Sequence, residues 1–410
     1  MSQGGAGMDE AGFQRQMVVL TAGMFCMSAS YNMMAPFLPV YLMQLGVSQE
    51  GLPLWTGVVF SVTYFVGAVM APIWGRFSDL WGRKTMCLRA MACVSLSYLL
   101  AAAVNDPYQL LAARIVNGFA NGYMPAAMAL LTSSAPGKKM GSALGFFLTG
   151  QLLGHICGPV FGGIVSHFWG IRASMVSGAV ILLMMTVLIF WFVQSSGAAS
   201  SPARSEGSQV SFGRVWHQPV LLEMLFCTFA FQCVILMMQS GMAVHLTDLS
   251  GGQDAVELKT GVILGLGGAA GAVSSAFWGR RGQTHGYFST MAVTLFFSGL
   301  AMCLQGLSSS VWVFGFLQFA GGLFLMGTMP SLNAVLAEHC PSEFRGRMFG
   351  MSAMMQQSGS MIGPLLTALL MARAGSAWIF LTGGLILILL ALHTVMRHSE
   401  KFSHSLYRHP

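Results

Sequence analysis

Long apolar segments follow one another along almost the whole chain, separated by short turn and charge signals. Three of them are MVVLTAGMFCMSASYNMMAPFLPVYL, VSGAVILLMMTVLIFWFV and WIFLTGGLILILLALHTVM. Each matches the roughly 20 residues that a helix needs to span a bilayer. Twelve such spans are predicted, at residues 17–44, 53–74, 85–105, 107–133, 140–168, 171–194, 219–246, 258–279, 286–307, 311–337, 347–373 and 376–398. The pattern indicates an all-α polytopic membrane protein with twelve transmembrane helices.

A polar stretch divides these spans into two sets of six. Residues 195–217 are rich in Ser, Gly and Ala and contain a proline, a composition typical of a flexible linker. We therefore expect a six-helix half at 17–194 and a second at 218–398, joined by a cytoplasmic linker. Residues 1–16 and 399–410 are expected to be cytoplasmic tails.

The two halves repeat each other weakly at an offset of about 205 residues. Four positions of the fifth span align with the eleventh: Gln151, Gly154, Gly158 and Pro159 with Gln356, Gly359, Gly363 and Pro364. Parallel repeats with a substrate site between them are a transporter architecture. The glycine stripe predicts close approach of another helix, and the prolines predict an interruption or kink. The expected hinge residues are Gly154, Gly158, Pro159, Gly162, Gly363 and Pro364.

Composition and charge agree with a membrane location. The chain is 55% hydrophobic and 8% charged, whereas soluble domains carry roughly 25% charged residues. Sixteen of the twenty Lys and Arg residues, Arg89 among them, fall in predicted cytoplasmic loops and tails, and three fall in outer loops. This asymmetry is the positive-inside pattern, so the net charge of +7 reports orientation and not a nucleic-acid partner. The eight scattered cysteines predict neither disulfides nor a metal site.

Arg114 stands out because a guanidinium within a span is costly unless it faces the protein interior. Its counterpart in the repeat is the neutral Gln318. We expect either a polar centre linked to substrate or protons, or a structural arginine that snorkels to the interface. By contrast, no Asp or Glu occupies the centre of a span.

Three motifs resemble the major facilitator superfamily. GRFSDLWGRK, at 75–84, is similar to the family's loop between the second and third spans, and RIVNGFANG resembles the arginine-glycine motif of its fourth span. GQLLGHICGPVFGG, at 150–163, resembles the fifth-span motif of the twelve-span drug:proton antiporters. PFLPVYLMQLGV looks like the MdtG-type multidrug exporters of bacteria. The resemblance covers about residues 18–397 and implies the major facilitator fold of two six-helix halves.

The resemblance also implies a gating latch that stabilises the outward-facing state. Its residues would be Gly75, Asp79, Gly82, Arg83 and Lys84, with Arg345 and Arg347 as possible partners. Alternatively, these charges could serve only to set the orientation of the helices in the membrane. Drug antiporters of the family often carry a carboxylate inside a span, and its absence here weakens a preference for cations.

Proton coupling, if present, has four candidate residues: His155, Glu223, Arg114 and Asp79. Histidine titrates near neutral pH, although a lone histidine in a helix is more often a hydrogen-bonded packing residue. The candidate substrate-binding residues are Tyr31, Asn32, Asn117, Asn121, Gln151, Gln232, Gln239 and Gln356. Thirty-two methionines suit a promiscuous surface, or simply fill core and lipid-facing positions.

The function favoured by these patterns is export of small amphipathic compounds by proton-coupled alternating access. A dedicated exporter of one metabolite, such as a siderophore or a lipid precursor, is the alternative, and a transporter-derived sensor or an enzyme is a remote one. No phosphate-binding loop, cofactor motif or Ser/His/Asp arrangement is apparent in the sequence. We expect a monomer in a bacterial inner membrane, with a small molecule, protons and lipid as its partners.

Overall fold

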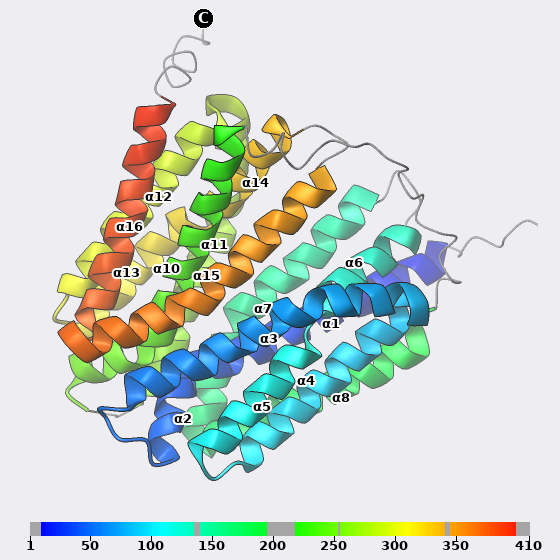
Figure 1. Ribbon diagram of the computed structural model, residues 1–410, viewed down its shortest axis with the longest axis horizontal. Helices are drawn as coiled ribbons and strands as arrows, with labels where there is room; N and C mark the ends of the chain where they lie inside the picture. The colour runs from blue at the N-terminus through cyan, green and yellow to red at the C-terminus, as the bar shows by residue number, and fades with distance from the viewer. Residues whose placement is uncertain (1–9, 135–139, 195–217, 253–254, 341–344, 399–410) are drawn as a thin grey trace, which may run out of the picture. The chain divides into compact units, whose positions relative to one another are not determined.

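The computed structural model describes residues 10–134, 140–194, 218–252, 255–340 and 345–398. The described residues form helices and no strands (Figure 1). In chain order they are α1 (Glu10–Met34), η1 (Ala35–Phe37), α2 (Leu38–Gln44), α3 (Leu52–Trp81), α4 (Arg83–Ala103), α5 (Pro107–Ala120), α6 (Tyr123–Ser134), α7 (Met140–Trp169), α8 (Ile171–Phe192), α10 (Pro219–Ser250), α11 (Val256–His285), α12 (Tyr287–Leu307), α13 (Val311–Leu325), α14 (Thr328–His339), α15 (Arg345–Ala374) and α16 (Ala377–Arg397).

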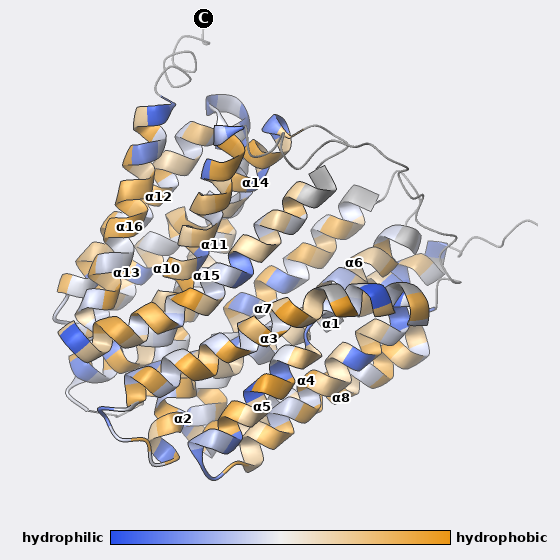
Figure 2. Ribbon diagram, viewed as in Figure 1, coloured by the Kyte–Doolittle hydropathy of each residue, from blue (hydrophilic) through white to orange (hydrophobic). Residues whose placement is uncertain are grey.

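The twelve predicted spans correspond to these helices, which confirms the fold class. Within the part of the chain that the structure describes, ten helical stretches are long and apolar enough to cross a membrane, and hydrophobic colours run along them in Figure 2. The span predicted at 107–133 consists of two helices, α5 and α6, and the span at 311–337 consists of α13 and α14. The outer face of α8 exposes Met184, Val187 and Trp191 by 61%, 55% and 74%, as a lipid-facing helix would.

The described residues group into two units, and each packs around its own core. Unit 1 comprises residues 1–34 and 66–204, and unit 2 comprises residues 35–65 and 205–410. In unit 1, α1 packs against α7, and α4 packs against α8. In unit 2, α10 packs against α15, and α12 packs against α16. These are the same pairings at corresponding places in the repeat.

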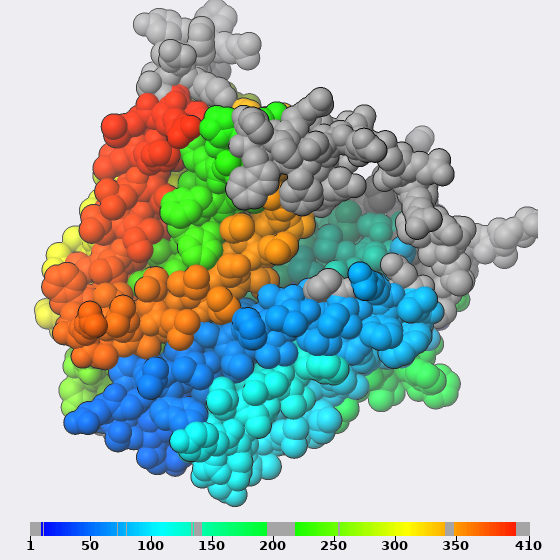
Figure 3. Space-filling model, in the orientation of Figure 1, coloured from blue at the N-terminus to red at the C-terminus, as the bar shows by residue number. Residues whose placement is uncertain are grey.

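Residues 35–65 belong to unit 2, although they lie in the predicted first half of the chain. Gly57 of α3 lies so close to α15 that an added Cβ would stand 3.1 Å from the carbonyl oxygen of Pro364. The Ser61 hydroxyl donates a hydrogen bond of 2.5 Å to the carbonyl of Met361. In the space-filling view the orange surface of α15 accordingly lies against the blue surface of the part of α3 that belongs to unit 2, residues 52–65 (Figure 3).

The glycine stripe of α7 brings this helix into backbone contact with α1, as its spacing predicts. A Cβ added at Gly154 would stand 2.5 Å from the carbonyl oxygen of Phe25, and one at Gly158 would stand 2.6 Å from that of Ala29. The prediction that proline interrupts the helix is wrong. Helix α7 continues from Met140 to Trp169 with Pro159 inside it.

The equivalent contact in unit 2 joins α15 to α10. Cβ atoms added at Gly359 and Gly363 would each stand 2.4 Å from a carbonyl oxygen of α10, those of Phe229 and Cys233. These partners are Phe25 and Ala29 shifted by 204 residues. Pro364 likewise lies inside an uninterrupted α15. The two units therefore repeat the same backbone packing, and not only similar residues in the sequence.

Candidate functional site

The polar centre of unit 1 lies around Arg114 on α5, where the side chain is buried (6% exposed). Its Nη2 donates to the thioether sulfur of Met34, 2.7 Å away. Tyr98 of α4 lies close enough to interact with the charge of Arg114 and with Tyr31. The arginine is therefore enclosed by residues of α1, α4 and α5, as expected for an interior guanidinium.

Asn117, one helical turn further along α5, faces the same neighbouring helix. Its amide nitrogen donates to the Ser97 hydroxyl at 2.7 Å, and that hydroxyl donates to the carbonyl of Val94 at 2.7 Å. Because a hydroxyl has one proton, this chain has a fixed direction. Of the sequence candidates, the structure thus brings Tyr31, Asn117 and Arg114 into one buried region of unit 1.

His155 is held by Asn32, another of the candidate binding residues. The Asn32 amide nitrogen lies 2.8 Å from the carbonyl of Ser28 and 2.9 Å from Nδ1 of His155. A carbonyl accepts only, so the amide group must present its nitrogen there, and Nδ1 then accepts the second bond. A neutral His155 ring consequently carries its proton on Nε2. The ring itself is exposed.

Asn121 and Gln151 have local partners within unit 1. Asn121 ends α5, where its side chain accepts a hydrogen bond from the nitrogen of Gly122 at 2.7 Å. The amide nitrogen of Gln151 lies 3.7 Å from the sulfur of Met124, at the limit of a weak contact. Asn121 therefore serves as a helix-ending residue, whereas Gln151 keeps most of its hydrogen-bonding capacity.

Arg89 is a residue whose role the sequence analysis missed. It was expected in a loop, but it lies within α4. Its guanidinium donates to the carbonyls of Phe119, Ala120 and Asn121, at 3.4, 3.5 and 2.8 Å. It also lies over the ring of Trp74, 3.6 Å from the ring centre. Helix ends leave carbonyl groups without partners, and Arg89 supplies donors where α5 breaks from α6.

The loop motif at 75–84 shows how the chain turns between α3 and α4. Gly82 adopts φ +87° at the start of α4, a conformation that favours glycine. Arg83 donates to the carbonyl of Ala129 at 2.7 Å, and Lys84 donates to that of Phe190 at 2.8 Å. The side chains of Asp79, Arg345 and Arg347 lie outside the described residues. None of the described atoms lies within 4 Å of a Cβ added at Gly75.

In unit 2, the candidate Gln232 of α10 meets α15. Its amide nitrogen donates to the Ser360 hydroxyl at 3.2 Å. Ser360 is the repeat counterpart of His155. At this position α7 and α15, the helices with the glycine stripe, each form a side-chain hydrogen bond with the helix packed against them. Gln239 and Gln356 are half-buried on the same two helices.

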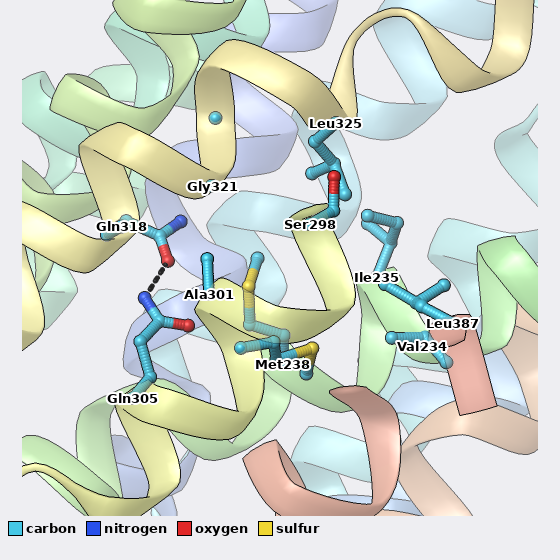
Figure 4. Close-up of a pocket in the computed structure, with 12 residues that line it drawn as sticks. Val234, Ile235, Met238, Ser298, Ala301, Gln305, Gln318, Gly321, Leu325 and Leu387 are labelled. Atoms are coloured by element: carbon cyan, nitrogen blue, oxygen red, sulfur yellow. Dashed lines mark hydrogen bonds between the residues drawn. The ribbon is translucent and has the colours of Figure 1, made fainter. Parts of the chain in front are cut away.

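A small cavity lies in unit 2 between α10, α12, α13 and α16, and its mostly apolar lining includes the polar side chains of Ser298, Gln305 and Gln318. Its volume is about 20 Å³, enough for about one water molecule. The Gln305 amide nitrogen donates to the side-chain oxygen of Gln318 at 2.7 Å on its wall (Figure 4). Gln318 is the counterpart of Arg114, and the sequence analysis gave no role to Gln305.

Glu223, a proton-coupling candidate, lies where α10 begins and α16 ends. It is buried (8% exposed), and its carboxylate oxygens face three basic side chains. Nε2 of His393 lies 3.5 Å away, Nε of Arg397 3.4 Å and Nε2 of His398 3.3 Å. The Arg397 guanidinium therefore compensates the charge of this buried carboxylate. Nothing in the sequence spacing indicated the histidine partners.

Comparison with known proteins gives consistent relatives for the whole chain. Residues 20–280 and 255–405 match the family model described as Major Facilitator Superfamily. The multidrug resistance protein MdtG of Proteus mirabilis is 28% identical over 369 residues, which covers 90% of this chain and 92% of that protein. The multi-drug resistance efflux pump PmrA homolog of Lactococcus lactis is also 28% identical, over 86% of this chain and 87% of that protein.

Solved structures share the fold at low sequence identity. A bacterial homolog of the human lysosomal transporter Spinster has a TM-score of 0.75 at 12% identity and covers 97% of this chain. The nucleoside transporter NupG has a TM-score of 0.77, also at 12% identity, over 93% of this chain. At such identities the likeness concerns the fold alone.

Proposed function

The chain belongs to the Major Facilitator Superfamily, and from this premise we propose that it exports small amphipathic compounds by proton-coupled alternating access. The observation that supports this proposal is the similarity of this chain to relatives named as multidrug resistance proteins or efflux pumps, along most of its length and of theirs. Each unit also holds uncharged hydrogen-bonding residues inside an apolar bundle, a lining suited to varied neutral or amphipathic cargo.

The proposed location is a bacterial inner membrane, with both chain ends on the cytoplasmic side. The segments that begin α10 and end α16 are then cytoplasmic, and Asp248 and Ser376 lie toward the outer side. We also propose that the protein works as a monomer of two six-helix halves, 17–194 and 218–398. The loop at 75–84 is proposed as a gating latch, with protons and a small molecule as the transported partners.

Arg114 is proposed to position substrate or to tune the polar centre of unit 1. Its burial against Met34 and near Tyr98 supports this role over that of a snorkelling residue. The hydrogen bond at His155 favours a role in binding substrate over a role in carrying protons. The Asn32 amide donates to Nδ1 and would oppose a proton on that atom.

The test is efflux from loaded proteoliposomes with and without an imposed pH gradient. We expect several structurally unrelated amphipathic dyes to be transported, at least tenfold faster with the gradient. Flux that ignores the gradient would refute proton coupling, and transport of a single compound would indicate a dedicated exporter. Arg114→Gln, which installs the residue found at Gln318, should alter the apparent KM for dyes while the gradient dependence persists.

A further inference from the structure

A buried histidine at the end of α10 is linked to the surface by two polar side chains. Nδ1 of His245 lies 2.9 Å from the Ser376 hydroxyl oxygen. That hydroxyl lies 2.5 Å from Oδ2 of Asp248 and donates to it. His245 is 3% exposed, whereas Asp248 is exposed. A continuous hydrogen-bonded chain therefore runs from the surface of unit 2 into its interior.

The order of the three groups excludes a nucleophilic triad. In such triads the histidine stands between the serine and the carboxylate, so that it can remove the serine proton. Here Ser376 stands between His245 and Asp248. A central hydroxyl both donates and accepts, which suits it to pass a proton and not to attack a substrate.

Ser376 is also not occupied with capping its helix. It is the residue that precedes α16, but its side chain makes no capping hydrogen bond to the first turn. Serine at such a position usually accepts a bond from the backbone there. Its hydroxyl faces Asp248 and His245 instead, so the link is not a by-product of a helix cap.

The surroundings of His245 leave Asp248 as its ionisable neighbour. Phe314 of α13 and Phe380 of α16 lie against the imidazole, with ring centres 5.4 and 4.8 Å away. Gln305 of α12 approaches through its main chain. Among the described residues, Asp248 is the group whose charge acts on the imidazole, and none of these neighbours on α12, α13 or α16 is ionisable.

On its inner side the imidazole neighbours Gln305, which also lines the small cavity. Nε2 of His245 is buried, and the main chain of Gln305 lies within hydrogen-bonding reach of the imidazole. The side chain of Gln305 donates to Gln318 on the cavity wall. The Ser298 hydroxyl on the same wall is 3% exposed and has no partner among the described residues. Figure 4 shows Gln305, Gln318 and Ser298 around this space, which one water molecule would fill.

We propose that His245 is a proton-binding site, loaded from the outer side through Asp248 and Ser376. That this site couples proton movement to transport rests on the proposed function, whereas the existence of the site does not. Before loading, the neutral ring carries its proton on Nε2, and the Ser376 hydroxyl is turned so that it donates to Nδ1. A hydronium ion then protonates Asp248 and leaves as water. Asp248 gives this proton to the Ser376 oxygen while Ser376 passes its own hydroxyl proton to Nδ1, after which the hydroxyl donates to the Asp248 carboxylate as in the structure. Asp248 ends as a carboxylate, Ser376 is unchanged, and His245 gains one proton and one positive charge.

The site can be tested without transport. The full chain is labelled with ¹⁵N-histidine in lipid nanodiscs, and the signals of His245 are those absent from His245→Gln. We expect its ring nitrogens to change protonation state between about pH 4 and 9. A ring that keeps one protonation state from about pH 4 to 9 would overturn the proposal. His245→Gln can keep a hydrogen bond to Ser376, so it is the conservative variant.

The coupling role is tested by comparing two transport modes of each variant. Gradient-driven efflux of His245→Gln and Ser376→Ala should fall at least tenfold, while substrate exchange without a gradient stays within twofold. Asp106→Asn is the matched control, because Asp106 is a half-buried acid that caps the start of α5 in unit 1, and this variant should keep wild-type coupling.

The outcomes separate this proposal from the proposed function. If the wild-type protein ignores the gradient, coupling fails, and the titration of His245 still decides whether the site exists. If the wild-type protein is coupled and His245→Gln remains fully coupled, the assignment of His245 is wrong. Loss of coupling in His155→Gln alone would move the proton site to unit 1 and would equally overturn it.

Discussion

Backbone contact between α1 and α7 makes Gly154 a sharp test of the packing. Gly154→Ala adds one methyl group, which would stand 2.5 Å from the carbonyl oxygen of Phe25 and 2.9 Å from the nitrogen of Ala29. Both atoms belong to backbone and cannot rotate away. Because ordinary contact begins near 3.4 Å, the two helices must separate locally by about 0.9 Å.

The cost follows from this displacement. Forcing an extra methyl group into a packed interior costs roughly 1–3 kcal/mol, and two backbone obstacles place this site near the upper end. Replacing glycine by alanine inside a helix returns up to ~1 kcal/mol through helix propensity. We therefore expect Gly154→Ala to lower the free energy of unfolding by about 2 kcal/mol.

The matched control is Gly145→Ala on the same helix. Among the described residues, nothing lies within 4 Å of a Cβ added at Gly145, so this variant gains helix propensity without a clash. It should be stabilised by up to ~1 kcal/mol. The assay is reversible unfolding of the purified protein in mixed micelles as the SDS fraction rises. A difference between the variants below about 0.5 kcal/mol, the range of ordinary surface changes, would refute the close packing.

Two further substitutions address charged residues that the fold places inside each unit. Arg89→Ala removes the hydrogen-bond donors to three carbonyls at the end of α5 and the contact with the Trp74 ring. The free energy of unfolding should therefore fall by about 2–3 kcal/mol. An unchanged value in the same micelle assay would refute the role of Arg89. Glu223→Gln should destabilise by about 1–3 kcal/mol, because it leaves the Arg397 guanidinium without its buried carboxylate partner. An unchanged free energy of unfolding in the same assay would contradict this role of Glu223.

The helical spans could be predicted from the sequence because a bilayer imposes a simple rule. Each spanning helix must be apolar over about 20 residues, and the glycines at turns such as Gly82 and Gly286, with φ near +87° and +86°, mark the ends. The break between α5 and α6 falls at Asn121-Gly122, where Gly122 adopts φ +122°. The hydrogen bonds at this break were not predictable in the same way, because their donor Arg89 lies about 30 residues earlier in the chain.

The polar sites were predictable only where their residues lie close together in sequence. The pairing of His245 with Ser376 joins positions 131 residues apart, and Glu223 meets His398 across 175 residues. Helix packing decides such contacts, and single-sequence patterns do not encode it. One usable signal existed, since His245 and Asp248 are three residues apart and therefore share a helix face. Only the position of Ser376 turns that face into a route inward.

The repeat separates the requirements of packing from those of chemistry. Gly154 and Gly359 approach equivalent backbone atoms of α1 and α10, because close helix contact needs the absence of a Cβ in both units whatever the cargo. Polar side chains carry no such requirement, so Arg114 can stand where the other unit has Gln318.

By the same offset of 204, His245 corresponds to Tyr41. A proton-binding residue must differ between the units if only one of them is to change charge during transport, and His245 meets that condition, as does His155 opposite Ser360. Between these two, only His245 has a hydrogen-bonded connection to an exposed carboxylate, whereas the Asn32 amide donates to the Nδ1 of His155. The position of the donor and acceptor groups, more than the identity of the residue, therefore favours unit 2 as the place where a proton is bound.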